Sequence, residues 1–371
     1  YYAKFDEGGG EIEVPEGYCE QDYLKLYAFL EIADADGVKN GTKLNEDYDP
    51  MDPTTWGTIN ENYDPEDPMT WGAGQNITWD EVTTGEGEDE VTVRYLWIFN
   101  APASDLCGQL DLSGCKFLQE VYVQNNALTQ VNVSDSAIWE LDCSGNRLTE
   151  LNVSGCGYLM NLVCGNNQLT ALELADCRRL ATVDCSGNQL TALNLSATNA
   201  LTTLNCENNR LSALTFNNMS YPIHVDCSGN QLTELNTDTM QFTRYLDCSD
   251  NQLTSLNVRN CSMLETFSCQ GNKLERLDLT SDGKYHALSL NAIGEGYVGY
   301  AMEQKEDGAT TYTVVATPVE GSVFQGWYTN RDCTTLVTTN STIDVTEIAP
   351  ADARDYYAKF DEGGGEIEVP E

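Results

Sequence analysis

The chain has 371 residues, enough for two or three domains, and its 59 acidic residues against 19 basic ones give a net charge of -40. Such a surface repels the phosphates of nucleic acids and of anionic membranes, so we expect neither as a partner. No apolar run approaches the roughly 18 residues of a membrane span, and the opening residues lack the basic and apolar regions of a signal peptide.

The same sixteen residues, YYAKFDEGGGEIEVPE, open the chain at 1–16 and close it at 356–371. Tyr356 to Phe360 is expected to be the last strand of a C-terminal β-domain. The first copy should then be the last strand of a preceding β-domain, followed by a linker. We therefore predict that the chain is one unit of a tandem array, in which 361–371 is the linker to a following unit.

The first predicted element after this segment is a helix from Glu20 to Ile32. Glu20 and Asp22 lie in its first turn, where the helix dipole favours acidic side chains. Apolar residues such as Leu26 and Phe29 leave almost no polar face, so this short helix is expected to be largely buried.

A polar region follows, and it contains a duplication, YDPMDPTTWG at 48–57 and YDPEDPMTWG at 63–72. Asp-Pro pairs favour turns and extended segments. Four clustered aspartates offer oxygen ligands for calcium: Asp49, Asp52, Asp64 and Asp67. Their spacing fits no EF-hand loop, and the alternative interpretation is a solvated loop held by its tryptophans. No other metal or cofactor is expected, because the chain has two histidines and no Cys-x-x-Cys pair.

Two strands joined by an acidic turn complete the N-terminal region. The first strand begins at Trp79, the turn occupies 85–89, and the second strand runs from Val91 to Phe99 with alternating apolar residues. We predict that 17–90 caps a solenoid, because the first coil would otherwise expose its apolar end.

A 21-residue unit repeats through the middle of the chain, and it predicts a solenoid over about 91–290. Each unit has a cysteine, an asparagine three residues later and a leucine two residues after that. The cysteines are Cys143, Cys164, Cys185, Cys206, Cys227, Cys248 and Cys269. Flanking copies are expected to centre on Val121 and Leu288.

The residue types of the unit have mechanical reasons. Alternating leucines point into a continuous core, and the cysteine is a small apolar side chain in that core. The asparagine amide is expected to satisfy turn groups of its own coil and of the next coil. Neighbouring parallel strands hold the cysteine β-carbons too far apart for a disulfide, so we predict free thiols. The state of Cys19, Cys107 and Cys333, outside the repeat, is left open.

The motif LxxLxCxxNxLxxL resembles the leucine-rich repeat, and its cysteine in place of a leucine resembles the cysteine-ladder internalins of bacterial surfaces. Residues 20–115 are similar to the N-terminal cap of such proteins. The resemblance implies a mostly β, α+β fold: a capped leucine-rich-repeat solenoid of 21-residue coils with a small antiparallel β-domain. It also implies an extracellular or bacterial cell-surface location.

After Leu290 the period ends, and 291–360 reads as strands separated by turns, including 312–316 and 343–345. The stretch TVVATPVEGSVFQGWY at 313–328, together with the closing YYAKF, resembles the small β-domain of the internalin B-repeat family. Phe324, Trp327 and Tyr328 are expected to form its core, since so small a domain needs large aromatic side chains.

Catalysis has little support in the sequence. His224 and Asp226 should face one side of a strand and Cys227 the other. Cys227 and His224 therefore cannot form a thiolate–imidazole pair within this strand. The other histidine, His286, lies about three coils away. The chain also lacks a glycine-rich phosphate loop and a serine elbow. We therefore predict that it is not an enzyme.

Binding is better supported, because residues that alternate with the inward leucines should line a concave sheet. Tyr122, His224 and Tyr245 break the repetition of small polar residues there, as a recognition site would. The predicted function is adhesion or recognition of a protein or glycan. The alternative is a structural spacer, whose partners are adjacent copies joined head to tail. The candidate residues are Glu120, Tyr122, Glu140, Asp142, Asn161, Asp184, Asn205, Glu207, His224, Asp226, Tyr245, Asp247 and Ser249.

Overall fold

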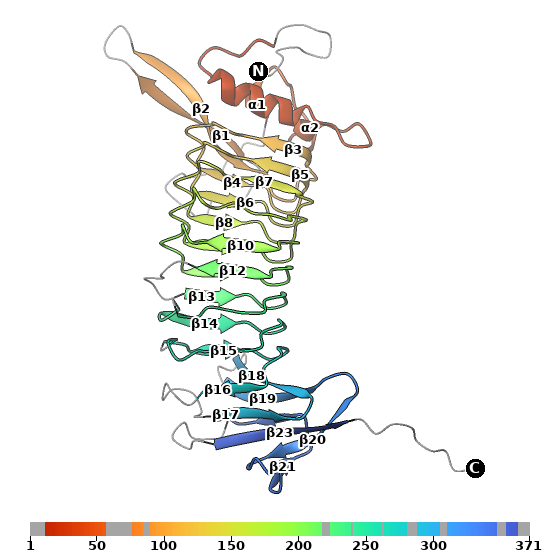
Figure 1. Ribbon diagram of the computed structural model, residues 1–371. Coiled ribbons are helices and arrows are strands. Elements are labelled where there is room, and N and C mark those ends of the chain that lie inside the picture. Colours follow the sequence, from red (N-terminus) through yellow and green to blue (C-terminus); the bar gives the residue numbers. More distant parts are fainter. Residues whose placement is uncertain are drawn as a thin grey trace, which may run out of the picture. The chain divides into compact units, whose positions relative to one another are not determined.

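The protein is mostly β, as Figure 1 shows, and it contains 21-residue solenoid coils with separate sheets near the C-terminus. This computed structural model confirms the predicted fold class. It describes residues 12–56, 76–84, 90–216, 223–238, 240–261, 263–279, 288–304, 310–346 and 354–362. No described helix is long and apolar enough to cross a membrane. The chain divides into two compact units, Tyr1–Leu190 with Asn194–Ala200, and Thr191–Leu193 with Leu201–Glu371.

The first unit begins with the predicted helix, α1 (Glu20–Leu30), followed by α2 (Asn40–Leu44) and a short 3-10 helix, η1 (Pro53–Thr55). Asn40 of α2 is fully buried and fixes this helical region to the first coil. Its side-chain amide donates to the Cys107 carbonyl at 2.9 Å, and its oxygen accepts from the Cys107 N–H at 3.0 Å. Asn40 thereby satisfies the backbone N–H and the carbonyl of Cys107. These groups belong to the first coil, which has no preceding coil to pair with.

The predicted hairpin is present as an antiparallel pair, in which Val82 and Val93 are partners. Its second strand starts a run of parallel strands, each one coil after the last. A second parallel sheet forms on another side of the same coils. The first run comprises β1 (Asn76–Thr84), β2 (Val91–Asn100), β4 (Glu120–Tyr122), β6 (Glu140–Asp142), β8 (Asn161–Val163) and β9 (Thr182–Asp184). The second sheet comprises β3 (Cys107–Asp111), β5 (Ala127–Asn132) and β7 (Glu150–Asn152).

The second unit continues the same repeat with its own parallel strands, in which Val225 is paired with Leu204 and with Leu246. The coil strands are β11 (Thr203–Asn205), β13 (Ile223–Asp226), β14 (Thr243–Asp247) and β15 (Thr266–Ser268). Two further strands, β10 (Ala192–Leu195), which spans the boundary between the units, and β12 (Ala213–Phe216), lie on another side of their coils.

The C-terminal strands form a five-stranded sheet, in the order β16-β17-β23-β20-β21, and a three-stranded sheet, in the order β18-β19-β22. Their bounds are β16 (Arg276–Asp278), β17 (Leu288–Ile293), β18 (Gly296–Gln304), β19 (Thr310–Pro318), β20 (Ser322–Tyr328), β21 (Leu336–Thr338), β22 (Thr342–Asp344) and β23 (Arg354–Glu362).

Two expectations for this region are wrong in detail. Leu288 does not centre another coil strand, because it belongs to β17, which pairs with β16 and β23. Tyr300 of β18 instead covers the last coil, where its carbonyl accepts from the Cys269 N–H and its ring stacks on Phe267 at 5.9 Å. Of the three predicted core aromatics only Trp327 is fully buried, whereas Phe324 and Tyr328 are half-buried. Phe324 and Tyr328 are less buried because Tyr356 and Phe360 of β23 fill the core beside Trp327.

The solenoid core consists of the repeated apolar positions. All seven repeat cysteines are fully buried beside the buried strand residues, such as Leu162 and Val183. All fourteen cysteines lie within the described residues and every one is a free thiol, as predicted for the repeat and now found for Cys19, Cys107 and Cys333. The cysteine therefore acts here as an apolar packing residue.

The repeated asparagines join successive coils, with a direction opposite to the prediction. The Asn188 amide donates to the Cys185 carbonyl of its own coil at 3.1 Å and to the Cys164 carbonyl of the preceding coil at 3.0 Å. Its oxygen accepts from the Leu169 N–H, also of the preceding coil, at 3.0 Å. The bond within its own coil confirms one part of the expectation, but the part that concerns the next coil is wrong, because the other partners lie in the preceding coil.

The turn after each cysteine needs a residue with positive φ, and this position alternates between two solutions. Gly187 has a φ of 60°, and Asn166, at the same position one coil earlier, has a φ of 54°. A β-carbon on Gly187 would lie 2.7 Å from the Asn166 side-chain oxygen. Glycine is required there because the asparagine of the preceding coil occupies the space that a side chain would fill.

Candidate functional site

The predicted concave residues lie on or directly after the parallel coil strands, with the buried strand residues between them. The first unit holds Glu120 and Tyr122 on β4, Glu140 and Asp142 on β6, Asn161 on β8 and Asp184 on β9. The second unit holds Asn205 on β11, His224 and Asp226 on β13, Tyr245 and Asp247 on β14, with Glu207 and Ser249 in the turns that follow. The strand geometry therefore produces two polar faces, one in each unit.

On the first unit, a tyrosine lies between two glutamates. Glu120 is only 4% exposed, and it is the register partner of Glu140 on the next strand. Burial raises the pKa of Glu120, although a hydrogen bond from Tyr122 opposes this shift. Burial, reinforced by Glu120 and Glu140, raises the pKa of Tyr122. The tyrosine therefore stays protonated and able to donate a hydrogen bond at neutral pH.

On the second unit, the two aromatic residues singled out from the sequence form one stack. His224 and Tyr245 are register partners on β13 and β14. Their ring centroids are 3.8 Å apart and their planes differ by 7°. The neighbouring residues in the same row are Thr203 and Thr266, whose side chains are small. The two stacked rings are therefore larger than the side chains beside them in the same row.

Burial and neighbouring carboxylates shift the pKa values of both residues in this stack. Burial raises the pKa of Tyr245 to about 12, with further contributions from Asp247, Asp226 and Glu207. The His224 side chain is largely exposed, but its partial desolvation lowers the pKa of the imidazole, whereas Asp226 opposes the shift. At neutral pH the stack therefore presents a neutral imidazole and a neutral phenol among acidic side chains.

The aspartates at the strand ends also have a structural task. The Asp226 carboxylate accepts from the Ser228 N–H at 3.0 Å and from its hydroxyl at 2.7 Å, and Asp247 accepts equivalently from Ser249. These bonds hold the turn out of the strand. The repeated aspartates among the candidate residues are thus engaged in holding their own turns.

The two calcium candidates that the structure describes also act within turns. Asp49 accepts from the Met51 N–H at 2.9 Å, and Asp52 accepts from the Thr54 N–H at 3.0 Å. Trp56 is fully buried and donates to the Asp49 carbonyl at 3.0 Å. Asp64 and Asp67 lie outside the described residues, as does His286. Among the described residues no group of three potential ligands could hold a metal ion.

Sequence reasoning missed an aromatic margin along the first unit. Trp97 lies within β2, and Trp139 and Met160 directly precede β6 and β8. Backbone hydrogen bonds join these three residues in sequence, with Gln119 between the two tryptophans. Two residues before this row, Tyr95 packs on Phe117 at 4.4 Å, and Arg179 lies 5.0 Å over the Tyr158 ring. Tyr158 is 57% exposed and Met160 44%. Comparing the residue before each strand across the repeats would have revealed this margin.

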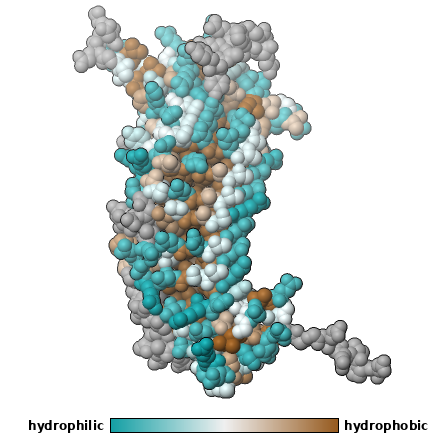
Figure 2. All heavy atoms as spheres, in the orientation of Figure 1, coloured by the Kyte–Doolittle hydropathy of each residue, from teal (hydrophilic) through white to brown (hydrophobic). Residues whose placement is uncertain are grey.

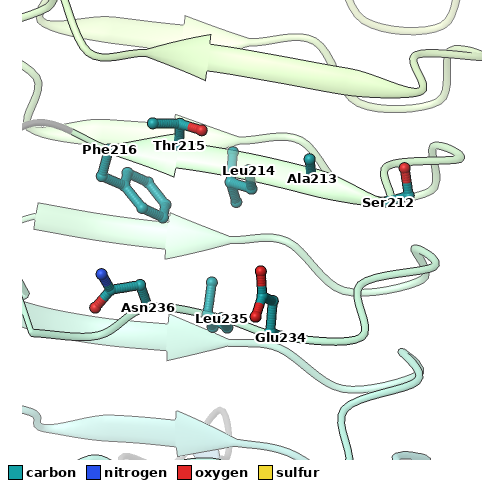
Figure 3. Close-up of a pocket in the computed structure, with 8 residues that line it drawn as sticks. All are labelled: Ser212, Ala213, Leu214, Thr215, Phe216, Glu234, Leu235 and Asn236. Carbon is teal, nitrogen blue, oxygen red and sulfur yellow. The ribbon is translucent and has the colours of Figure 1, made fainter.

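A cavity of about 490 Å³ lies away from the coil strands of the second unit, between β12 and residues 234–236. Figure 3 shows Leu214 and Phe216 directed from β12 toward Leu235 and Asn236. The lining of this cavity holds one charged residue, Glu234, which is exposed. Nothing in this lining directs a specific ligand.

Figure 2 shows hydrophobic residues along the coils of each unit with hydrophilic residues on either side. The exposed apolar surface of the coils therefore follows the repeat.

The sheets of the C-terminal strands agree with a known family. Residues 286–364 match the model of the divergent InlB B-repeat domain. This match confirms the resemblance that the motif at 313–328 and the closing YYAKF predict. In the B-repeat domain Trp327 is fully buried, and Phe324 and Phe360 contact each other with ring centroids 5.6 Å apart.

Solved structures of leucine-rich-repeat proteins are similar to about half of the chain. The functional domain of InlJ from Listeria monocytogenes, which includes a cysteine ladder, is 24% identical over 54% of this chain and 51% of its own, with a TM-score of 0.39. The leucine-rich effector protein YopM from Yersinia pestis is 22% identical over 45% of this chain and 56% of its own, with a TM-score of 0.36. The leucine-rich repeat domain of APL1B is 20% identical over 45% and 61%, with a TM-score of 0.33. Each match thus spans less than two thirds of the other protein. No curated protein matches the sequence.

Proposed function

We propose that this chain is a non-enzymatic recognition module of an extracellular or cell-surface protein, which adheres to a protein or glycan through its concave coil strands. The stack of His224 on Tyr245 carries this proposal, since it concentrates two aromatic side chains on one row. Aromatic residues contribute disproportionately to binding energy at interfaces. The absence of catalysis is supported by the different burial of two residues: His224 on β13 is exposed, whereas Cys227, directly after β13, is fully buried.

The charges of the same faces favour a positively charged partner. The candidate residues in the second unit include Glu207, Asp226 and Asp247 but no lysine or arginine. Those in the first unit include Glu120, Glu140 and Asp142, again without a basic side chain. A basic protein surface or a cationic glycan would gain attraction during approach and at contact.

The repeated segment supports a multivalent arrangement. Sixteen identical residues at both ends of the chain fit a unit of a tandem array, whose acidic, glycine-containing linkers would extend by self-repulsion. Many weak sites on one polypeptide would then adhere strongly by avidity. The same segment supports the alternative of a structural spacer without a ligand.

The test is adhesion of beads coated with the complete chain to cultured epithelial cells, to bacterial cells and to a printed glycan panel. We expect the double variant His224→Ala, Tyr245→Ala to lose most adhesion. Phe242→Ala is the matched control, because Phe242 is 40% exposed in the same coil as Tyr245 but precedes the strand. Equal adhesion by the double variant and the wild type would contradict the concave site. A wild-type chain that adheres to none of the three surfaces would favour the spacer.

A further inference from the structure

The last strand of the B-repeat domain occupies a central position in its sheet. β23 pairs in parallel with β17, where Ala358 is the partner of Ala292, and antiparallel with β20, where Ala358 is the partner of Trp327. A strand paired on both edges contributes backbone hydrogen bonds to two neighbours. Removing it would therefore separate β17 from β20 and β21.

The side chains of β23 also supply much of the domain core. Tyr356 and Phe360 are each 3% exposed, and Ala358 is fully buried. The Tyr356 ring meets the fully buried Trp327 edge to face at 6.4 Å, and Phe360 packs on Phe324 at 5.6 Å. Specific occupancy of this slot therefore depends on the alternating pattern Tyr-x-Ala-x-Phe.

The same pattern recurs at the start of the chain. Tyr1, Ala3 and Phe5 correspond to the three inward residues of β23, and residues 1–7 match 356–362 throughout. We propose that the slot between β17 and β20 accepts residues 1–7 of a second copy, so that chains join head to tail by strand exchange. Such exchange of identical elements between copies is a low-cost route to oligomers.

Two segments compete for the slot, β23 of the same chain and residues 1–7 of a second copy, and they differ in how they are attached to the domain. Residues 1–7 carry the same side chains as Tyr356 to Glu362, including the three that β23 buries. The resident strand is also tethered to its own domain, which gives it a high effective concentration. The wild-type chain should therefore be mainly monomeric. Weakening the resident strand alone should shift the slot to the second copy.

The test uses the complete chain with Ala358→Asp, Ala3→Asp and both substitutions together. A carboxylate at the fully buried position 358 should expel β23, because its burial without a partner is unfavourable. We expect Ala358→Asp to form multiples of the 40.9 kDa mass that grow with concentration in light scattering. Ala3→Asp should remain monomeric, and the double variant should remain monomeric with an unfolded B-repeat domain.

The folding of the domain is followed by fluorine NMR of 5-fluorotryptophan-labelled protein, with the Trp327 signal assigned from Trp327→Phe. In the Ala358→Asp oligomers that signal should keep its native position, and in the double variant it should move to the solvent-exposed position. A monomeric Ala358→Asp chain at all concentrations would overturn the proposal. Oligomers of equal size from the double variant would overturn it as well, since they would reflect aggregation of an unfolded domain. Neither result depends on a ligand of the concave face.

Discussion

Replacing Asn188 by alanine tests how strongly the repeated asparagine holds successive coils together. Asn188 is 7% exposed and lies within the first unit. The substitution removes the acceptor of the Leu169 N–H at 3.0 Å and the donor to the carbonyls of Cys164 and Cys185 at 3.0 and 3.1 Å. Leaving a buried polar group without its partner costs about 1–3 kcal/mol. The amide also donates to the Ser186 carbonyl at 3.2 Å. Because one N–H and three carbonyls are affected, we expect the free energy of unfolding to fall by about 3 kcal/mol.

The measurement is urea unfolding followed by circular dichroism, with Asn194→Ala as the matched control. Asn194 is exposed on β10 of the same coil, and its oxygen accepts from the Ser196 N–H at 3.0 Å. An exposed local hydrogen bond is replaced by water, so this control should lose less than about 1 kcal/mol. Equal losses for the two variants, or a loss below about 1 kcal/mol for Asn188→Ala, would refute the account of the ladder.

Two further predictions concern ionisable groups. Burial raises the pKa of Cys185 and of Cys269 to about 12, so the native protein should show at most three thiols that react rapidly with DTNB, those of Cys19, Cys107 and Cys333. The denatured, unreduced protein should show nearly all fourteen, and four or more missing thiols would contradict the free ladder. NMR titration should place the pKa of His224 below its ordinary value of 6.5, and Asp226→Asn should lower it further because that carboxylate favours the imidazolium. The contribution of His224 to stability is then complete above pH 6.5 and is lost as the pH falls through the lower folded pKa. A pKa at or above 6.5, or an increase on Asp226→Asn, would contradict this environment.

The sequence alone determined the solenoid, because each coil repeats the same solution to burial. Leucine and cysteine at fixed positions require an apolar interior. Because these positions recur every 21 residues, successive coils bury them by stacking on one another. The alternation of strand side chains also placed His224 opposite Cys227. The helix from Glu20 and the hairpin whose second strand begins at Val91 followed from the local spacing of apolar residues.

The tertiary structure decided what depends on neighbours far apart in the chain. A single repeat shows that Asn188 satisfies backbone groups, but only the stacked coils show that these groups belong to the preceding coil. Leu288 fits the apolar pattern of a coil strand, yet it pairs with Arg354 in another sheet because β23 supplies a partner that the repeat pattern does not contain. The contact of His224 with Tyr245 likewise requires the register of two strands separated by a full coil. Side-chain type and spacing thus fix which residues are buried, whereas the register between elements fixes which of the remaining residues meet.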